Sequence, residues 1–238
     1  MDLPDLPKTE AAIIAQTNSF RAENKLGALT SNPALMAAAQ SFADFLARNG
    51  KFGHEADGRK HNERIRAAGY RYCVAAENLA LNQHSNGFKT EKLATDAVKG
   101  WINSPPHRAA MLHPFVTETG VGIAQGPDSA PKFISVQLFG RPETFKYEFK
   151  IENRTQQRIS YRFHEADQVL DARTEVTTTD CLPGSVTFDL GHVKSTFEAA
   201  DGIAFVVDRR SDGLAQVAVE RLGRAGALIK NGGTKSAR

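Results

Sequence analysis

The chain has 238 residues, of which 41% are hydrophobic and 24% are charged, and its formal net charge is +3. These values are typical of globular proteins and exclude an intrinsically disordered chain. A charge of +3 over this length is too small for the dense basic face of a nucleic-acid-binding protein. No apolar run approaches the roughly 18–20 residues that span a bilayer, so we expect no transmembrane segment.

The first seven residues carry neither a basic region nor an apolar block, so no signal peptide is visible, although the chain given could be a trimmed form. Two cysteines, Cys73 and Cys181, are too few for a metal site of their own. They could form a single disulfide, and the sequence leaves that pairing open. The length allows one large domain or two small ones.

Four helices are predicted in the first half of the chain. The clearest begins at Asn32-Pro33, because Asn is a preferred N-cap and Pro suits the first helical position. Apolar side chains then recur at three- and four-residue spacing from Leu35 to Leu46, and Asn49-Gly50 ends the helix. The other three predicted helices cover residues 9–25, 62–68 and 90–103.

Alternating hydrophobicity replaces the helical period after Thr117. Residues 121–124 and 133–139 predict two strands joined by a turn-rich segment, and they are expected to pair antiparallel. Residues 74–81 could supply another strand. Helices that each bury one apolar face against a small antiparallel sheet predict an α+β fold, arranged as an α/β/α sandwich.

A second domain is predicted after this sandwich. We expect the first domain to cover residues 1–141, with a linker at 142–145, a β-rich domain at 146–222 and a basic, Gly-rich tail at 223–238. The second domain is expected to be all-β, either a sandwich or an open barrel. Its strands are predicted at 146–151, 159–163, 186–190, 203–207 and 214–219.

The side chains suited to chemistry gather in the first domain, around His54, around Glu77-Asn78 and in the stretch Trp101 to Arg108. That stretch places the only Trp before a Ser-Pro-Pro turn. Two consecutive prolines are expected to stop the helix and to hold His107 in a fixed direction. The pattern around His54 is not the histidine pair of the zinc proteases. No nucleophile elbow, phosphate-binding loop or dinucleotide fingerprint is present, so three common enzyme classes lose support.

Taken in order, these residues resemble the bacterial branch of the CAP superfamily, which comprises cysteine-rich secretory proteins, antigen five and pathogenesis-related proteins. The resemblance covers about residues 8–141 and none of residues 146–238. It implies an α/β/α sandwich with a shallow cleft in which two histidines and acidic residues meet. The residues that carry it are His54, Asp57-Gly58, Arg64-Ile65, Gly69-Tyr70, Glu77-Asn78, Val98, Trp101, Asn103, Ser104, Pro105, His107-Arg108 and Gly120-Val121-Gly122.

By position, His54 and His107 match the two cleft histidines of that family, and Glu77 matches the acidic residue of its Gly-Glu-Asn motif. The resemblance implies further residues that support the cleft, namely Asn78, Trp101, Ser104 and Arg108.

Three positions depart from the family's pattern. Ala76 stands where the motif usually has Gly, and Pro106 stands where Gly usually precedes the histidine. Ser104 occupies the place of a second Glu in many animal members, so a full set of two histidines and two glutamates is missing.

Two interpretations of the cleft remain open at this point. Two imidazoles bind a divalent cation such as zinc if both present a lone pair to one point, which would make His54 and His107 metal ligands that Glu77 completes or orients. Alternatively, the three side chains form a hydrogen-bonded cluster that joins the helices to the sheet.

The resemblance implies a secreted, periplasmic or cell-envelope protein that acts as a non-catalytic binding module. Its partner would be a small hydrophobic ligand such as a lipid, or an envelope or protein partner, and we expect a monomer that binds no nucleic acid. The alternative is a peptidase or esterase that depends on a metal or on a Ser/His pair. In that case Ser104, His107 and Glu77 would act as nucleophile, base and orienting group, which requires a geometry that spacing across two prolines does not guarantee.

Overall fold

The computed structural model describes residues 2–127, 130–222 and 228–229, and the chain forms two compact units, Met1–Thr144 and Phe145–Arg238. The tail expected at 223–238 lies outside the described residues, apart from the short strand Leu228–Ile229. No helix in the described part of the chain is long and apolar enough to cross a membrane.

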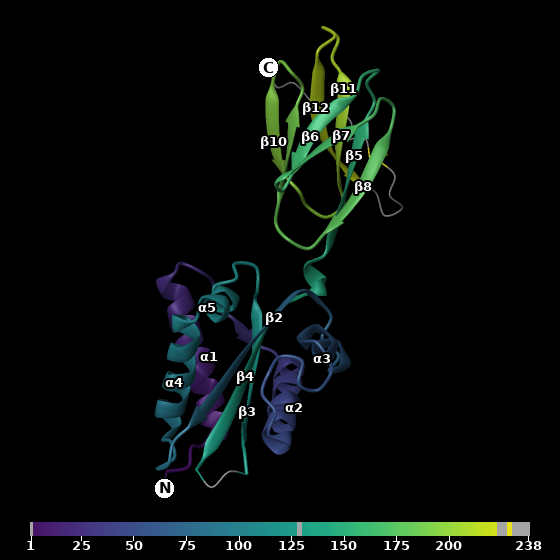
Figure 1. Ribbon diagram of the computed structural model, residues 1–238. Coiled ribbons are helices and arrows are strands. Elements are labelled where there is room, and N and C mark those ends of the chain that lie inside the picture. Colours follow the sequence, from purple (N-terminus) through teal and green to yellow (C-terminus); the bar gives the residue numbers. More distant parts are fainter. Residues whose placement is uncertain (1, 128–129, 223–227, 230–238) are drawn as a thin grey trace. The chain divides into compact units, whose positions relative to one another are not determined.

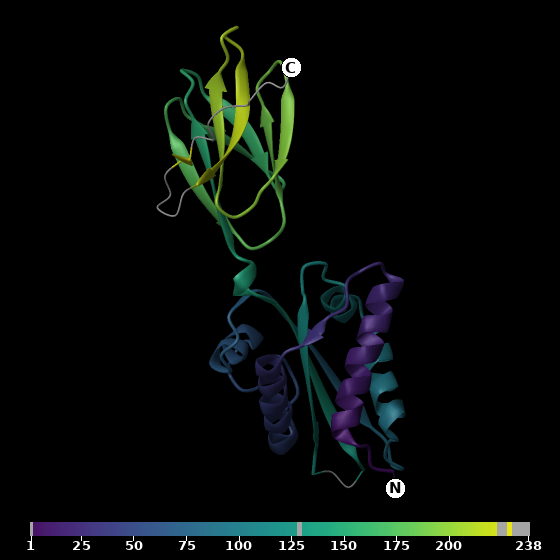
Figure 2. The ribbon, with the colours of Figure 1, turned by 180° about the vertical axis from the view of Figure 1, so that it is seen from behind.

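The first unit is an α/β/α sandwich, as predicted (Figure 1). Its sheet has the order β1-β3-β4-β2, in which β2 and β3 both run antiparallel to β4 and the short β1 runs parallel to β3. Helices α1, α4 and α5 cover one face and α2 and α3 cover the other (Figures 1 and 2). The elements are α1 Leu6–Glu23, β1 Thr30–Ser31, α2 Pro33–Asn49, α3 His61–Ala67, β2 Tyr72–Gln83, α4 Thr90–Asn103, α5 Pro105–Met111, β3 Glu118–Gln125, β4 Lys132–Pro142 and a 3-10 turn at Glu143–Phe145.

Helix α2 begins and ends where its sequence predicts. The Asn32 carboxamide oxygen accepts from the backbone N–H of Ala34 at 2.9 Å, which satisfies one of the unpaired donors of the first turn. At the other end Gly50 has φ +61°, a left-handed conformation that glycine adopts without strain. The helix lies directly on β3, since a Cβ atom at Gly122 would stand 2.2 Å from the Gln40 backbone nitrogen.

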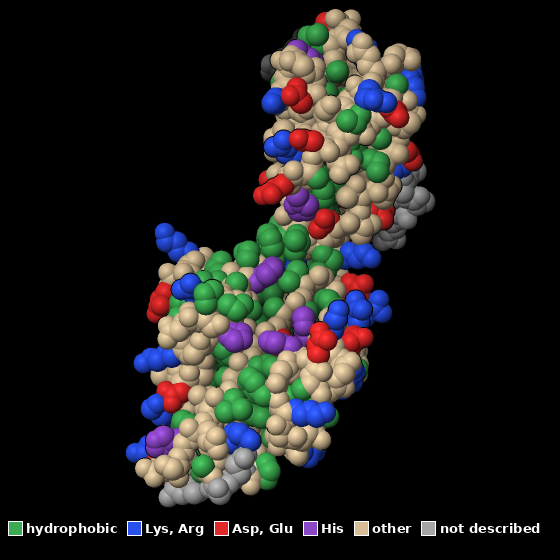
Figure 3. All heavy atoms as spheres, viewed as in Figure 1, with side chains coloured by type: hydrophobic (Ala, Val, Ile, Leu, Met, Phe, Trp, Pro, Cys, Tyr) green, Lys and Arg blue, Asp and Glu red, His purple; other side chains and the backbone are tan. Residues whose placement is uncertain are grey.

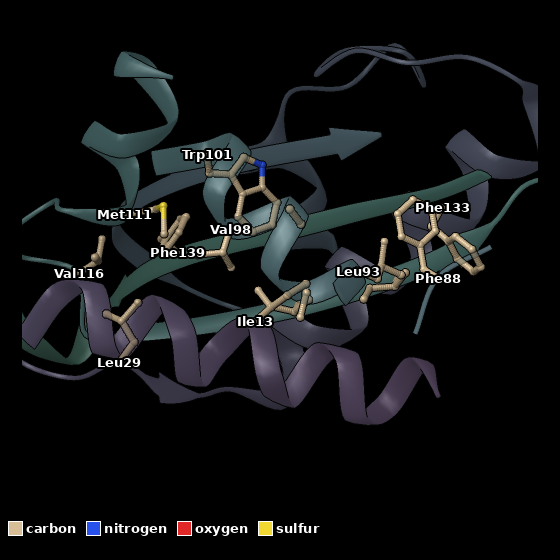
Figure 4. Packing of buried hydrophobic residues seen from close by; sticks show 14 residues of the cluster. Ile13, Leu29, Phe88, Leu93, Val98, Trp101, Met111, Val116, Phe133 and Phe139 are labelled. Carbon is tan, nitrogen blue, oxygen red and sulfur yellow. The ribbon is translucent and has the colours of Figure 1, made fainter. Parts of the chain in front are cut away.

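Each face of the sheet carries its own apolar core. On the α1/α4/α5 side, Trp101 and Ile13 are almost completely buried among aliphatic and aromatic neighbours (Figure 4). On the α2/α3 side, Phe42 and Leu46 pack against side chains of β2 and β4. The middle layer is therefore covered on both faces, and the sheet is open to solvent only at its edges.

The second unit is all-β. The sequence left a sandwich and an open barrel as alternatives, and the structure is a sandwich of two sheets. One sheet has the order β10-β9-β6-β7 and the other β13-β12-β11-β5-β8, with β11 and β5 as its parallel pair. The strands are β5 Tyr147–Asn153, β6 Ile159–Phe163, β7 Ala166–Leu170, β8 Glu175–Asp180, β9 Ser185–Asp189, β10 Lys194–Glu198, β11 Ile203–Arg209, β12 Ala215–Leu222 and β13 Leu228–Ile229. Strands β7, β8 and β10 were not predicted.

Aromatic side chains from both sheets form the core of this unit. Phe188 of β9 and Phe205 of β11 are fully buried with ring centroids 5.8 Å apart, and Phe149 of β5 lies 5.8 Å from Phe205. Such aromatic pairs stabilise by about 0.5–1.5 kcal/mol beyond the area they bury. The two sheets are thus held face to face by a continuous apolar layer.

Candidate functional site

The candidate site is built around β2, the edge strand of the first unit's sheet. Successive side chains of a strand point to opposite faces of the sheet, so Glu77 and Asn78 contact different helical layers. Glu77 contacts His54 and Arg64, from the loop before α3 and from α3 itself, while Asn78 contacts His107 of α5. Two consecutive residues of one strand therefore bring both helical layers to the same point of the sheet edge.

The Glu77 carboxylate is buried and both of its oxygens are engaged. Oε1 lies 2.8 Å from Nδ1 of His54, and Oε2 accepts from Nη2 of Arg64 at 2.7 Å. The Glu77 side chain is 1% exposed, whereas that of His54 is 52% exposed. A carboxylate at this distance favours the His54 tautomer that carries its proton on Nδ1, which leaves the Nε2 lone pair available.

Arg64 organises the loop that carries His54. Its guanidinium donates to the carboxylate of Asp57 at 2.9 Å and to the backbone oxygens of Arg59 at 2.6 Å and His54 at 2.9 Å. It also stacks over the Phe42 ring, 3.5 Å from the centroid, which is a cation–π contact. In the sequence, Arg64 and Asp57 stand out only as positions that match the family, and no role was predicted for them. The pattern of apolar residues could not reveal this role, because the two carboxylates that Arg64 binds stand 7 and 13 residues away in the sequence.

His107 lies on a helix, which corrects the expected turn. Pro105 and Pro106 follow the end of α4 at Asn103, where the helix was expected to stop, and occupy the first two positions of α5. Proline is favoured there because the first helical N–H groups need no partner within the helix and its fixed φ suits the helix. The Asn78 side chain donates to the His107 backbone oxygen at 3.0 Å, so the edge strand fixes the backbone of this turn.

The His107 ring makes no hydrogen bond with any described residue. Partial burial lowers the pKa of His107, and the nearby His54 lowers it further, because a second positive charge would be repelled there. Near neutral pH the ring is therefore an uncharged imidazole with one free lone pair.

The two imidazoles face each other at a distance too long for a shared zinc ion. Their ring centroids lie 6.5 Å apart with an interplanar angle of 44°. Tetrahedral zinc at about 2.0–2.1 Å from each nitrogen would place the ring centres about 5 Å apart. Within the described ranges no group of three or more His, Cys, Asp or Glu side chains could hold a metal ion. The residues do not fit a closed zinc site, because Glu77 is engaged and only two imidazoles remain.

The other expected supporting residues divide into two kinds. Trp101 is buried and donates from Nε1 to the Leu79 backbone oxygen at 2.9 Å, which ties α4 to β2 beside the site. Ser104 precedes α5, and its hydroxyl forms no hydrogen bond to His107 or to another described residue. Arg108 is exposed and forms no ion pair within the part of the chain that the structure describes. Asn78 and Trp101 thus contact the site, and Ser104 and Arg108 do not.

Histidine side chains gather with hydrophobic ones on one face of the first unit (Figure 3). Two exposed apolar residues adjoin the site in sequence: Phe52, two residues before His54, is 50% exposed, and Leu81, further along β2, is 43% exposed. This surface therefore offers imidazole nitrogens next to uncovered apolar area.

Several solved bacterial structures are similar to part of this chain. An extracellular protein containing an SCP domain from Bacillus anthracis is 23% identical, with a TM-score of 0.47, over 57% of this chain and 41% of that one. An outer surface protein from Borrelia burgdorferi is 21% identical, with a TM-score of 0.47, over 56% of this chain and 92% of that one. A cysteine-rich secretory protein from Staphylococcus aureus is 20% identical, with a TM-score of 0.41, over 58% and 40% of the two chains.

This chain thus spans about two fifths of the Bacillus and Staphylococcus proteins. No curated protein sequence matches it. The model of the cysteine-rich secretory protein family, CAP, matches residues 14–139, which is more than half of the chain and includes every residue of the site. The chain therefore belongs to the cysteine-rich secretory protein (CAP) family.

Proposed function

We propose that the first unit is a non-catalytic binding module that acts outside the cytoplasm, and that the surface around His54, Glu77 and His107 binds a small hydrophobic ligand or an apolar segment of an envelope partner. The observation that carries this proposal is the state of Glu77. Its carboxylate is buried and both oxygens are engaged, so it positions His54 and is not available to a substrate.

The geometry gives no support to a hydrolase. A nucleophile and its base need to lie within hydrogen-bond reach of each other, and the Ser104 hydroxyl makes no such bond to His107 in the described structure. The Glu77 carboxylate contacts His54, so it does not orient the His107 ring. A metal-dependent mechanism lacks a third protein ligand among the described residues.

Exposed apolar area next to polar groups supports a binding role. Phe52, two residues before His54 in the chain, is 50% exposed, and Leu81, on the same strand as Glu77, is 43% exposed. Apolar surface buried on binding contributes about 25 cal/mol per Å², and a few convergent polar groups orient the ligand. The extracellular and outer-surface names of the similar bacterial structures accord with a location outside the cytoplasm.

The experiment compares three proteins for binding of a fluorescent fatty acid, of phospholipid vesicles and of purified cell-envelope fragments. They are the wild type, the double variant Phe52→Gln/Leu81→Gln and the control Leu214→Gln, which changes a residue of the second unit that is 46% exposed. We expect the double variant to bind at least tenfold more weakly and the control to match the wild type. Equal binding by all three proteins would refute this apolar surface as the binding site.

A parallel assay measures hydrolysis of generic ester and peptide substrates. We expect no turnover above the buffer rate. Turnover that is lost to the same extent in Ser104→Ala and His107→Ala would reverse the assignment in favour of a hydrolase, because a nucleophile and its base fail together.

A further inference from the structure

A groove of about 580 Å³ lies on the outer face of the sheet β10-β9-β6-β7 in the second unit. Ile159 and Tyr161 of β6 and Val186 and Phe188 of β9 are buried in the core, so the residues between them point outward. The groove's volume falls within the range of about 300–1,000 Å³ that is usual for small-molecule sites.

The groove is hollow because its central strands carry short side chains. Ser160 of β6 and Thr187 of β9 form the floor. Longer side chains line its sides, namely Arg162 of β6, Asp167 of β7, Asp189 of β9 and Lys194 of β10. Hydroxyl groups thus lie beneath charged groups.

The charges around the groove cancel in pairs. Arg162 forms a two-point contact with Asp167, from Nε to Oδ1 at 2.6 Å and from Nη2 to Oδ2 at 2.9 Å. Lys194 lies 3.2 Å from Asp189. In Figure 3, positive and negative side chains likewise stand next to each other on the visible face of this unit. These exposed ion pairs present further donors and acceptors without a net charge.

Other classes of ligand match this groove poorly. A peptide cannot add as a strand, because β6 and β9 are paired on both sides. A phosphorylated ligand or a nucleic acid needs an excess of positive charge, and two cations here face two carboxylates. A lipid needs an apolar lining, and Val169, which is 56% exposed, is the single exposed aliphatic side chain among the described lining residues.

We propose that this groove binds a neutral oligosaccharide. Vicinal hydroxyls of a sugar both donate and accept, which matches the Ser160 hydroxyl and the unused donors and acceptors of the two ion pairs. The Thr187 hydroxyl lies 2.9 Å from that of Thr196 and keeps capacity for a further hydrogen bond. The C–H face of a sugar ring packs on Val169. This site lies in the second unit, so its test is independent of the binding surface proposed for the first unit.

The test is isothermal titration of the full chain with three neutral probes, cellotriose, maltotriose and N-acetylchitotriose. The variant Ser160→Ile fills the floor of the groove with a residue suited to strands. The control Thr177→Ile makes a similar change at an exposed position of β8, on the other sheet. A second variant, Arg162→Gln, removes the two-point ion pair while leaving the floor unchanged.

We expect at least one probe to bind the wild type and the control, and to bind Ser160→Ile and Arg162→Gln at least tenfold more weakly. The absence of binding to all three probes at concentrations of about 10 mM would overturn the proposal. Equal affinity of Ser160→Ile and Thr177→Ile would overturn it as well, because the bound sugar would then lie elsewhere.

Discussion

Replacing Arg64 with Met tests how much of the site's stability depends on one buried guanidinium. Arg64 donates charged hydrogen bonds to Asp57, Arg59, His54 and Glu77. At about 1.5–3 kcal/mol each these bonds would sum to roughly 6–12 kcal/mol, but that sum ignores the cost of dehydrating the guanidinium in the wild type. Breaking a buried pair by removing one partner costs about 3–5 kcal/mol, and we expect Arg64→Met to fall in that range.

Trp101 makes the measurement specific, because it is the only tryptophan of the chain and lies in the core of the first unit. Urea unfolding followed by its fluorescence therefore reports on that unit. A loss of 3–5 kcal/mol corresponds to a fall in melting temperature of about 6–20 °C for a domain of this size. The control Arg108→Met changes an exposed arginine and is expected to stay within about 0.5 kcal/mol of the wild type.

A double-mutant cycle separates lost charge pairing from lost packing. If Glu77 depends on Arg64, the variant Arg64→Met/Glu77→Met loses less stability than the sum of the two single changes, by at least about 2 kcal/mol. The reason is that the double variant leaves no unpaired carboxylate at Glu77. Single-variant losses that simply add, or a cost below about 1 kcal/mol for Arg64→Met, would refute the reasoning.

Two further predictions concern the histidines. Calorimetric titration with Zn²⁺ is expected to show weak binding, with a dissociation constant of about 0.01–1 mM, because the two imidazoles lie too far apart to share one ion and each binds it alone. The double variant His54→Ala/His107→Ala should give no heat, and a wild-type constant below about 1 µM would contradict binding by single imidazoles. Burial lowers the pKa of His107 from its ordinary value of 6.5, and the nearby His54 lowers it further. As the pH falls through 6.5, His107 is therefore protonated in the unfolded chain before it is protonated in the folded one. The free energy of unfolding decreases as a result. Melting temperatures measured at pH 7.5 and at about pH 5 should therefore differ less in His107→Gln than in the wild type, and an unchanged difference would contradict the pKa shift.

Local signals predicted the helices and the long strands well. Asn32-Pro33 marked the start of α2, and the apolar spacing up to Trp101 marked α4, because both depend on neighbours within a turn or two. The strands β7, β8 and β10 were missed, since each leaves most of its residues exposed or half-exposed. Such strands are specified by pairing with distant partners, which a single sequence does not display.

The prolines show why a local pattern can have two structural meanings. Pro105-Pro106 ends α4 and also begins α5, and both outcomes follow from the missing N–H and the fixed φ of proline. Met111, at the end of α5, is buried in the α1/α4 core, which favours the helix. The site residues were found through family resemblance, while the role of Arg64 required the fold that places it between Asp57 and Glu77.

The edge strand explains why the two histidines differ in freedom. His54 is held through its ring, because Nδ1 contacts the buried Glu77 carboxylate. His107 is held through its backbone oxygen by Asn78, and its ring has no partner among the described residues. One imidazole is thus hydrogen-bonded through its ring, and the other residue is held through its backbone. A ligand at this surface would be oriented by His54 and accommodated by His107, so differences among ligands should appear in the His107 ring first.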